Sequence, residues 1–213
     1  MFEEFKKRRP YMTGDTVKFA ALHVSQRMRD FHDSEAMWNA AGHMEELLRA
    51  EHLLTDVIFD DSLTVDRLSH YPAVVLANST CLSDEQCRAL GEYVRGGGTL
   101  LATMESSLRD EWGIPRENFG LAELFGIDYI ETRGQSPQIL VPQTPTLKRD
   151  FDHLVAFVAP GVHFALREDA NVEALFTHSS RPIHGLSVSK DTYDSGMPAI
   201  TADTLTLPRL TEP

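Results

Sequence analysis

The sequence predicts an α/β protein whose first half forms a parallel β-sheet with helices on both faces. Two observations support this prediction. Between residues 17 and 129, short apolar runs suited to buried strands alternate with segments of helical periodicity. At this spacing, strand–helix–strand crossovers are right-handed and place the strands in parallel. After Gly113 the alternation loosens into short, proline-broken runs, so the second half is expected to be irregular and β-rich.

Four apolar runs of the first half are the predicted strands. They are KFAALHVS (18–25), TDVIFDD (55–61), YPAVVLANS (71–79) and TLLATM (99–104). Between the first two runs, residues 33–52 predict a helix with Asp33 or Ser34 as N-cap. Its apolar residues recur at helical spacing: Met37, Ala40, Ala41, Met44, Leu47 and Leu48.

A second helix is predicted to begin after Ser83. Gln86 follows Ser83 at the spacing of a capping box. The expected buried stripe consists of Cys87, Leu90, Tyr93 and Val94. Gly96, Gly97 and Gly98 should end this helix, because glycine adopts the left-handed conformation without a Cβ penalty.

The second half offers weaker signals. Residues 117–127 predict a short helix with Phe119, Ala122 and Phe125 inward and Gly126 as its stop. The later apolar runs are expected to be irregular hairpins and edge strands that complete the same domain; they cover residues 138–143, 153–158, 162–167, 172–178 and 184–190. The predicted organisation is a lead-in or linker over residues 1–16 and a single α/β domain over residues 17–213.

Composition restricts the class of partner. The chain has 213 residues, of which 42% are hydrophobic and 24% charged, as in soluble globular proteins. A formal net charge of -12 argues against nucleic acid and anionic membranes as partners. The basic cluster at residues 6–9 suits a solvated tail or tether, or a localisation or anion-binding patch.

Targeting signals are not found in the sequence. No apolar run approaches the roughly 20 residues of a membrane span, and no apolar segment follows the charged start, as a signal peptide requires. The 2 cysteines, Cys81 and Cys87, lie in one short stretch, which is typical of free thiols. A cytoplasmic location is therefore the expectation.

Ligands of open α/β sheets bind outside the carboxyl ends of the strands. The predicted ends are Ser25-Gln26, Asp60-Asp61, Asn78-Ser79 and Glu105-Ser106. A crevice built from them is polar and acidic, as a site for a sugar or a cation would be, although loops and helix caps need the same residue types. The candidate ligand-binding residues are Gln26, Asn78, Glu105 and Ser106.

Two catalytic arrangements are open at this edge. Glu105 with Asp110 or Glu111 would supply the paired carboxylates that glycoside hydrolysis uses, whereas the alternative is a carboxylate that caps the following serine turn. Cys81 precedes a helix N-terminus, which favours a nucleophilic thiol. The alternative for Cys81 is a buried, inert thiol.

Metal and cofactor motifs are not recognised. The 9 histidines show no HExxH or CxxC-type ligand spacing, so no metal site is expected. The run Gly96–Gly98 ends a helix and enters a strand, the reverse of the order in a phosphate-binding loop. No cofactor is expected.

The chain resembles the β-galactosidase trimerisation domain of family 42 glycoside hydrolases. It is more similar still to the related module that follows a glycoside-hydrolase barrel in larger bacterial proteins. The resemblance is specific from about Phe19 to Tyr129. It rests on Leu82 to Gln86, Tyr93-Val94 with Gly97-Gly98, Glu105 to Leu108, Asp110-Glu111 and Leu124 to Gly126.

The resemblance implies a flavodoxin-like fold similar to class I glutamine amidotransferases. True amidotransferases carry a cysteine in Gly-x-Cys-x-Gly after the strand that matches TLLAT, a turn called the nucleophile elbow. Here that position falls at or beside Met104; neither flanking glycine is present and no His-x-Glu follows. The resemblance therefore implies a member without amidotransferase activity.

Three hypotheses on function follow. The first is a non-catalytic accessory domain in carbohydrate metabolism that self-associates as a dimer or trimer, or contacts an adjacent glycoside-hydrolase barrel. The second is a hydrolase that uses Glu105 with Asp110 or Glu111, or Cys81, and the third is a sugar-binding module near Gln26, Asn78 and Glu105. Residues proposed for self-association, or alternatively for the core, are Phe151, Leu154, Phe157, Val158 and Phe164.

Overall fold

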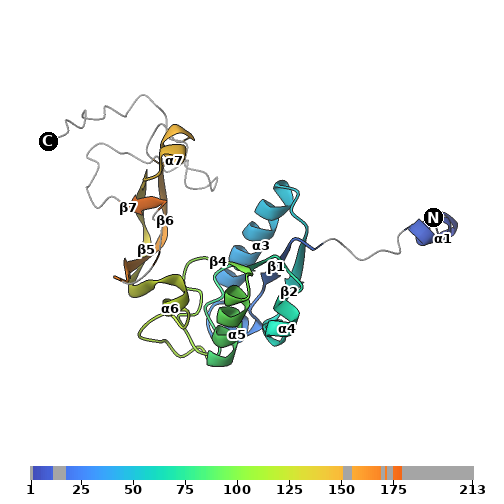
Figure 1. Ribbon diagram of the computed structural model, residues 1–213, viewed down its shortest axis with the longest axis horizontal. Helices are drawn as coiled ribbons and strands as arrows, with labels where there is room; N and C mark the ends of the chain where they lie inside the picture. Colours follow the sequence, from blue (N-terminus) through green and yellow to red (C-terminus); the bar gives the residue numbers. More distant parts are fainter. Residues whose placement is uncertain (1, 12–17, 151–154, 169–170, 172–174, 179–213) are drawn as a thin grey trace. The chain divides into compact units, whose positions relative to one another are not determined.

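A computed structural model describes residues 2–11, 18–150, 155–168, 171 and 175–178 (Figure 1). The chain divides into two compact units. The first comprises residues 1–130 and 164–170, and the second comprises residues 131–163 and 171–213. The candidate site lies entirely in the first unit.

The first unit is built on a four-stranded parallel sheet. Its strands are β1 (Ala20–His23), β2 (Thr55–Ile58), β3 (Ala73–Leu76) and β4 (Thr99–Ala102). They lie in the order β2-β1-β3-β4, and every adjacent pair is parallel. All four predicted strands are confirmed. This order is that of a flavodoxin-like doubly wound sheet, in which the direction of winding reverses between β1 and β3.

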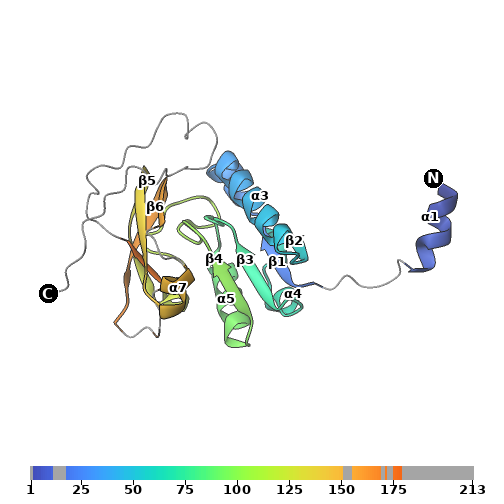
Figure 2. The same ribbon diagram turned by 90° about the horizontal axis from the view of Figure 1, so that it is seen from above.

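Helices cover both faces of the sheet, as predicted (Figure 2). Because side chains alternate along a strand, Ala20 and Leu22 of β1 point to one face and Ala21 to the other. On the first face, Ala40, Met44 and Leu48 of α3 (Ser34–Ala50) pack against the strands. The opposite face packs against α4 (Val65–Leu68) and α5 (Asp84–Arg95).

The helix α5 begins and ends where the sequence predicts. The Ser83 hydroxyl accepts a hydrogen bond from Gln86 N at 3.2 Å, and the Gln86 side chain accepts one from Ser83 N at 2.8 Å, which completes the capping box. Cys87, Leu90 and Tyr93 are buried in the core. Gly97 has φ +100°, the left-handed conformation expected after the helix.

Several short helical segments of the first unit were not predicted. One is α2 (Gln26–Phe31), which begins at Ser25, where the hydroxyl accepts a hydrogen bond from Met28 N at 3.1 Å. The lead-in carries α1 (Phe2–Arg8) and a 3-10 turn, η1 (Arg9–Tyr11). A second 3-10 turn, η2 (Asp60–Ser62), follows β2. Segments of this length are too short to show helical periodicity.

The chain from residue 122 onward contains one more short helix of the first unit and a second sheet. The predicted helix at 117–127 is confirmed only over α6 (Ala122–Phe125). The further elements are β5 (Ile127–Pro142), α7 (Pro145–Asp150), β6 (Val155–Leu166) and β7 (Phe176–His178).

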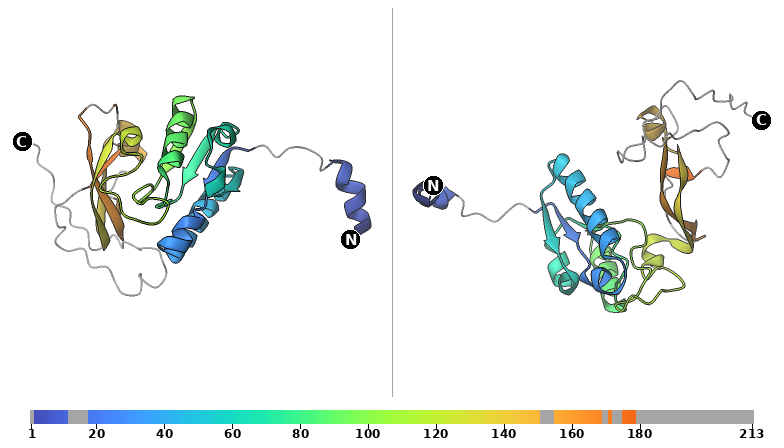
Figure 3. Two further views of the ribbon diagram at one scale, coloured as in Figure 1. Left: turned by 90° about the horizontal axis from the view of Figure 1, so that it is seen from below. Right: turned by 180° about the vertical axis from the view of Figure 1, so that it is seen from behind.

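The second sheet confirms the β-rich second half, in the order β6-β5-β7 (Figure 3). Its β5 and β7 are antiparallel, with Leu140 opposite His178. The strands are longer than predicted, since β5 continues through Pro137 and β6 through Pro160. The predicted run at 184–190 lies outside the described residues, and a single domain over residues 17–213 stays a prediction.

Candidate functional site

The carboxyl ends of β1 and β2 are joined through Asp60. One carboxylate oxygen of Asp60 accepts hydrogen bonds from Gln26 N at 2.7 Å and Arg27 N at 3.2 Å. The other accepts one from the Ser25 hydroxyl at 3.2 Å. Of the predicted strand-end residues, Gln26 and Asp60 are therefore brought together, and Asp60 fixes the start of α2.

His23, the last residue of β1, extends this network to β3. Its Nδ1 lies 2.8 Å from the Ser79 hydroxyl, and its Nε2 lies 3.4 Å from Asp60 Oδ1 without hydrogen-bond geometry. Serine, histidine and aspartate are the residue types of a hydrolytic triad. Here His23 is 0%, Ser79 1% and Asp60 5% exposed, so a substrate has no access to His23 or Ser79 in this conformation. The arrangement links three strand ends inside the protein.

Charge is stabilised at Asp60. Burial raises the pKa of this carboxyl group, but the neighbouring His23 and the backbone N–H groups of Arg27 and Gln26 lower it by more. The net result is a pKa below that of an ordinary aspartate. Asp60 is therefore a buried carboxylate that stays ionised at neutral pH.

The ends of β3 and β4 are joined by Asn78 and Ser106. Asn78 Oδ1 accepts a hydrogen bond from Glu105 N at 3.1 Å, and Asn78 N donates one to the Thr103 hydroxyl at 3.0 Å. Ser106 Oγ accepts a hydrogen bond from Ser79 N at 3.0 Å and is buried. The structure thus groups the candidates Asn78, Glu105 and Ser106 at one place, with Gln26 in the adjoining β1–β2 network.

The turn after β4 has unusual backbone geometry. Met104 has φ +53°, and Asn78 at the end of β3 also has φ +53°. A left-handed conformation costs a non-glycine residue free energy, which the surrounding hydrogen bonds must offset. The resemblance places the nucleophile position at or beside Met104, and this residue combines a left-handed backbone with a thioether side chain.

The Glu105 carboxylate faces His32, which follows α2. Glu105 Oε2 lies 3.9 Å from His32 Nε2, and both side chains are partly exposed. Burial and the positive charge of Arg109 lower the pKa of His32, and Glu105 opposes them only in part. At neutral pH the pair consequently consists of a neutral imidazole beside a solvent-accessible carboxylate.

The acidic residues beyond Glu105 lie in a tight turn. Asp110 Oδ1 accepts hydrogen bonds from Trp112 N and Ile114 N, both at 2.9 Å. This carboxylate therefore caps the turn. Glu111 lies in the same turn and is half-buried.

Both cysteines have the environment of core residues. Cys81 is fully buried, and burial raises its pKa to about 11. Burial likewise raises the pKa of Cys87 to about 11. Since the thiolate is the reactive species, neither thiol is activated in this fold at neutral pH.

Sequence reasoning did not select Phe31, His32 or Trp112. The Phe31 and Trp112 rings form an edge-to-face pair with centroids 5.8 Å apart, and both rings are exposed. The signal in the sequence that could have indicated Trp112 is a tryptophan inside a polar turn, directly after Asp110 and Glu111.

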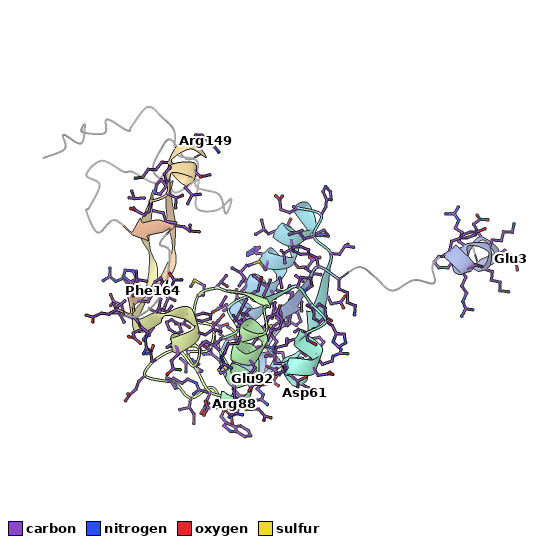
Figure 4. The ribbon with its side chains drawn as sticks, in the orientation of Figure 1. Glu3, Asp61, Arg88, Glu92, Arg149 and Phe164 are labelled. Carbon is purple, nitrogen blue, oxygen red and sulfur yellow. The ribbon has the colours of Figure 1, made fainter. Side chains whose placement is uncertain are left out.

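A groove of about 350 Å³ lies between the start of α4 and the outer face of α5. Its lining carries charges of both signs, including Asp61, Arg88 and Glu92, which Figure 4 labels. Among the residues that the structure describes, no cluster of three histidine, cysteine or acidic side chains is arranged to bind a metal ion. None of the helices within those ranges has the length and apolar character to cross a bilayer.

The fold and this edge define the first unit as a doubly wound α/β domain of the flavodoxin-like class, with polar residues gathered at its switch point. No protein-family model and no curated protein sequence matches the chain.

Solved structures share the fold. The chain is similar to Gan42B, a GH42 β-galactosidase from G. stearothermophilus, with a TM-score of 0.66 and 15% identity over 83% of this chain and 26% of that one. A β-galactosidase from Bacillus circulans has a TM-score of 0.63 and 15% identity, over 87% of this chain and 28% of that one. A thua-like protein from Bacteroides uniformis has a TM-score of 0.59 and 15% identity, over 78% of this chain and 71% of that one. The chain therefore spans about a quarter of the β-galactosidases it matches.

Proposed function

We propose that the chain is a non-catalytic accessory domain of carbohydrate-active proteins, which mediates contacts between subunits or with an adjacent glycoside-hydrolase barrel. The shared fold with one part of larger β-galactosidases supports the association with carbohydrate metabolism. A cytoplasmic location belongs to the same proposal.

The observation that carries the non-catalytic role is that polar side chains at the carboxyl edge of the sheet hydrogen-bond to the backbone of the protein itself. Asp60 and Asp110 accept backbone N–H groups, and Asn78 and Ser106 connect β3 to the turn after β4. Catalytic carboxylates and nucleophiles instead need access to substrate and to a reacting proton. Cys81, the other candidate nucleophile, is buried and protonated.

The outer strands support the assembly role. Register places Val57 of β2 beside Leu22, and Leu101 of β4 beside Val75, so both side chains lie on the face that carries α3. Val57 is 50% and Leu101 47% exposed. Apolar residues exposed on outer strands suit contact with another protein surface, because burial there removes apolar area from water.

Of the residues that the sequence analysis proposes for self-association, one has a described side chain. Phe164 is exposed, whereas Phe151 and Leu154, and the side chains of Phe157 and Val158, lie outside the described residues. We therefore base the proposed contact on β2 and β4, with Phe164 as a further candidate.

The experiment that tests the non-catalytic role is a hydrolase screen of the full chain. Nitrophenyl glycosides of several sugars, β-galactosides included, are incubated with wild-type protein and with Glu105→Gln. We expect wild-type rates equal to those of the buffer and no difference between the two proteins. Turnover that Glu105→Gln abolishes would contradict the proposal and favour the hydrolase.

A further inference from the structure

An exposed aromatic pair includes Phe31, the chain neighbour of His32, and His32 faces the Glu105 carboxylate. Trp112 is 65% and Phe31 49% exposed, although their rings contact each other edge to face. His32 follows Phe31 directly, and its Nε2 lies 3.9 Å from Glu105 Oε2. The rings, the imidazole and the carboxylate therefore share one neighbourhood, which three separate segments of the first unit build: the end of α2, the turn after β4 and the turn at residues 110–114.

The turn that carries Trp112 is held by several specific contacts. Asp110 accepts the two backbone N–H groups within it, and Arg109 Nη1 donates a hydrogen bond to Gly113 O at 2.9 Å. Gly113 has φ +79°, and a Cβ at this position would lie 2.6 Å from Phe31 O. Only glycine lets the turn approach the end of α2 this closely. The position of Trp112 against Phe31 is thus fixed by the local fold.

The polar groups define the chemistry of a ligand. Glu105 presents carboxylate oxygens, which accept hydrogen bonds. The pKa of His32 is lowered, so its imidazole is neutral at pH 7 and both donates and accepts. A negatively charged ligand is disfavoured beside this carboxylate in a chain with a net charge of -12. The neighbourhood suits a neutral ligand that combines an apolar surface with hydroxyl groups.

We propose that Trp112, Phe31, Glu105 and His32 form a binding site for a neutral pyranose sugar. A pyranose has an apolar face of C–H groups that packs on an exposed ring, while its hydroxyl groups hydrogen-bond to the carboxylate and the imidazole. This inference deepens the proposed function by naming a ligand, and it rests on that proposal only for the choice of sugars. Trp112 and Phe31 are binding residues here, and Arg109 and Gly113 position them.

The first experiment uses Trp112 as its own reporter. The sequence contains 2 tryptophans, so Trp38→Phe leaves Trp112 as the single one. This variant of the full chain is titrated with lactose, cellobiose and galactose, and with sorbitol as a polyol that has no pyranose ring. We expect a saturable change in Trp112 emission with at least one of the sugars and none with sorbitol. Flat emission for every sugar, or an equal response to sorbitol, would overturn the site.

Calorimetric titration with the responding sugar then compares wild type with three variants. Trp112→Ala and Glu105→Gln should each weaken binding by about 10-fold, the size expected for one aromatic contact or one hydrogen bond to a charged group. Trp38→Ala is the matched control, because Trp38 is also an exposed tryptophan, at 58%. It should change the affinity by less than about 2-fold, within the range of a surface substitution.

The same variants separate this site from a contact between protein chains. If Trp112→Ala lowers the mass of the particle in light scattering while wild type gives no heat with sugars, the aromatic pair is a protein contact and the sugar site is refuted. Sugar binding with an unchanged mass supports the site whatever the oligomeric state. An unchanged sugar affinity in Trp112→Ala would also refute it.

Discussion

Side chains at the ends of adjacent parallel strands hydrogen-bond to one another, and this keeps the carboxyl edge of the sheet in place. Asp60 binds the backbone at the start of α2, and Asn78 binds the backbone of Glu105. Each bond gives a partner to a backbone N–H group that follows a strand end. The polar residues of this edge therefore contribute to stability first.

We predict that Asp60 makes the stability of the folded protein depend on pH in the acidic range. The pKa of Asp60 in the folded state lies below the value of about 3.9 for an unfolded aspartate. The folded state therefore binds fewer protons, so the contribution of Asp60 to stability is fully present above about pH 4 and is lost as the pH falls through the lowered folded pKa.

Urea unfolding between pH 7 and pH 3 measures this contribution in wild type and Asp60→Asn. Asp60→Asn should be less stable at pH 7, by about 1–3 kcal/mol, since His23 and two backbone N–H groups lose a charged partner. It should also lose less stability on acidification than wild type. Parallel pH profiles for the two proteins would show that Asp60 is not the group responsible.

A second prediction concerns the cysteines. Because both thiols are buried and their pKa values are raised to about 11, Ellman's reagent at pH 8 should react with neither while the protein is folded. After unfolding in guanidinium chloride, both should react. Rapid reaction of one thiol in the native protein, lost in Cys81→Ser, would restore Cys81 as a candidate nucleophile.

Sequence reasoning placed the polar residues that follow strands but missed those that depend on neighbours in space. Gln26, Asn78 and Glu105 were found because strand ends of a parallel sheet share one edge. His23 was not, since it lies inside an apolar strand and meets Ser79 and Asp60 only after folding. Phe31 ends α2 and Trp112 lies in the turn at residues 110–114, so the two are far apart in sequence and their approach depends on Gly113.

At the scale of elements, the strength of the local signal decided which parts were predictable. The long helix α3 and the capped helix α5 show periodicity and end signals, and both were predicted with their correct starts. The short helices α2 and α4 depend on their packing against neighbours, which the sequence alone does not display. In β5 the prolines suggested breaks, yet the strand continues through Pro137 and ends at Pro142.

The junction between α5 and β4 provides the prediction at this scale. A Cβ on Gly98 would lie 2.1 Å from the ring of Tyr93, whose hydroxyl donates a hydrogen bond to Tyr71 O at 3.0 Å. Gly98→Ala should therefore destabilise the protein by about 1–3 kcal/mol, as overpacking of a core does. Urea unfolding measures the change.

The matched control is Gly42→Ala in the middle of α3. A Cβ there has no neighbour within 4 Å, so alanine should stabilise the helix by about 0.5–1 kcal/mol. Opposite signs for the two glycine substitutions are the expected outcome. Equal effects would mean that Gly98 does not approach Tyr93 as described.

At the scale of the whole molecule, the parallel sheet of the first unit leaves apolar residues exposed on both of its outer strands. On the face that α3 covers, Val57 of β2 and Leu101 of β4 remain exposed. The proposed role in assembly assigns this surface to contact with a second protein, and the fold shared with a quarter of a β-galactosidase agrees with such a role.

A charge on this surface should weaken assembly. Leu101→Asp places a carboxylate where an apolar contact is proposed, and burying that charge would cost several kcal/mol. We expect sedimentation velocity to show a shift of this variant towards monomer. Leu47→Asp on α3, at a leucine that is 57% exposed, is the control and should sediment like wild type. Unchanged sedimentation of Leu101→Asp would remove β4 from the interface.

The central claim, that this chain is an assembly domain, is tested most directly by the mass of the wild-type protein in solution. Static light scattering of the full chain at micromolar concentration, in low and in moderate salt, compares the observed mass with the 23.9 kDa of one chain. We predict a dimer or trimer whose mass does not change with salt, because apolar contacts are not screened. A mass of 23.9 kDa at both salt concentrations would contradict the claim.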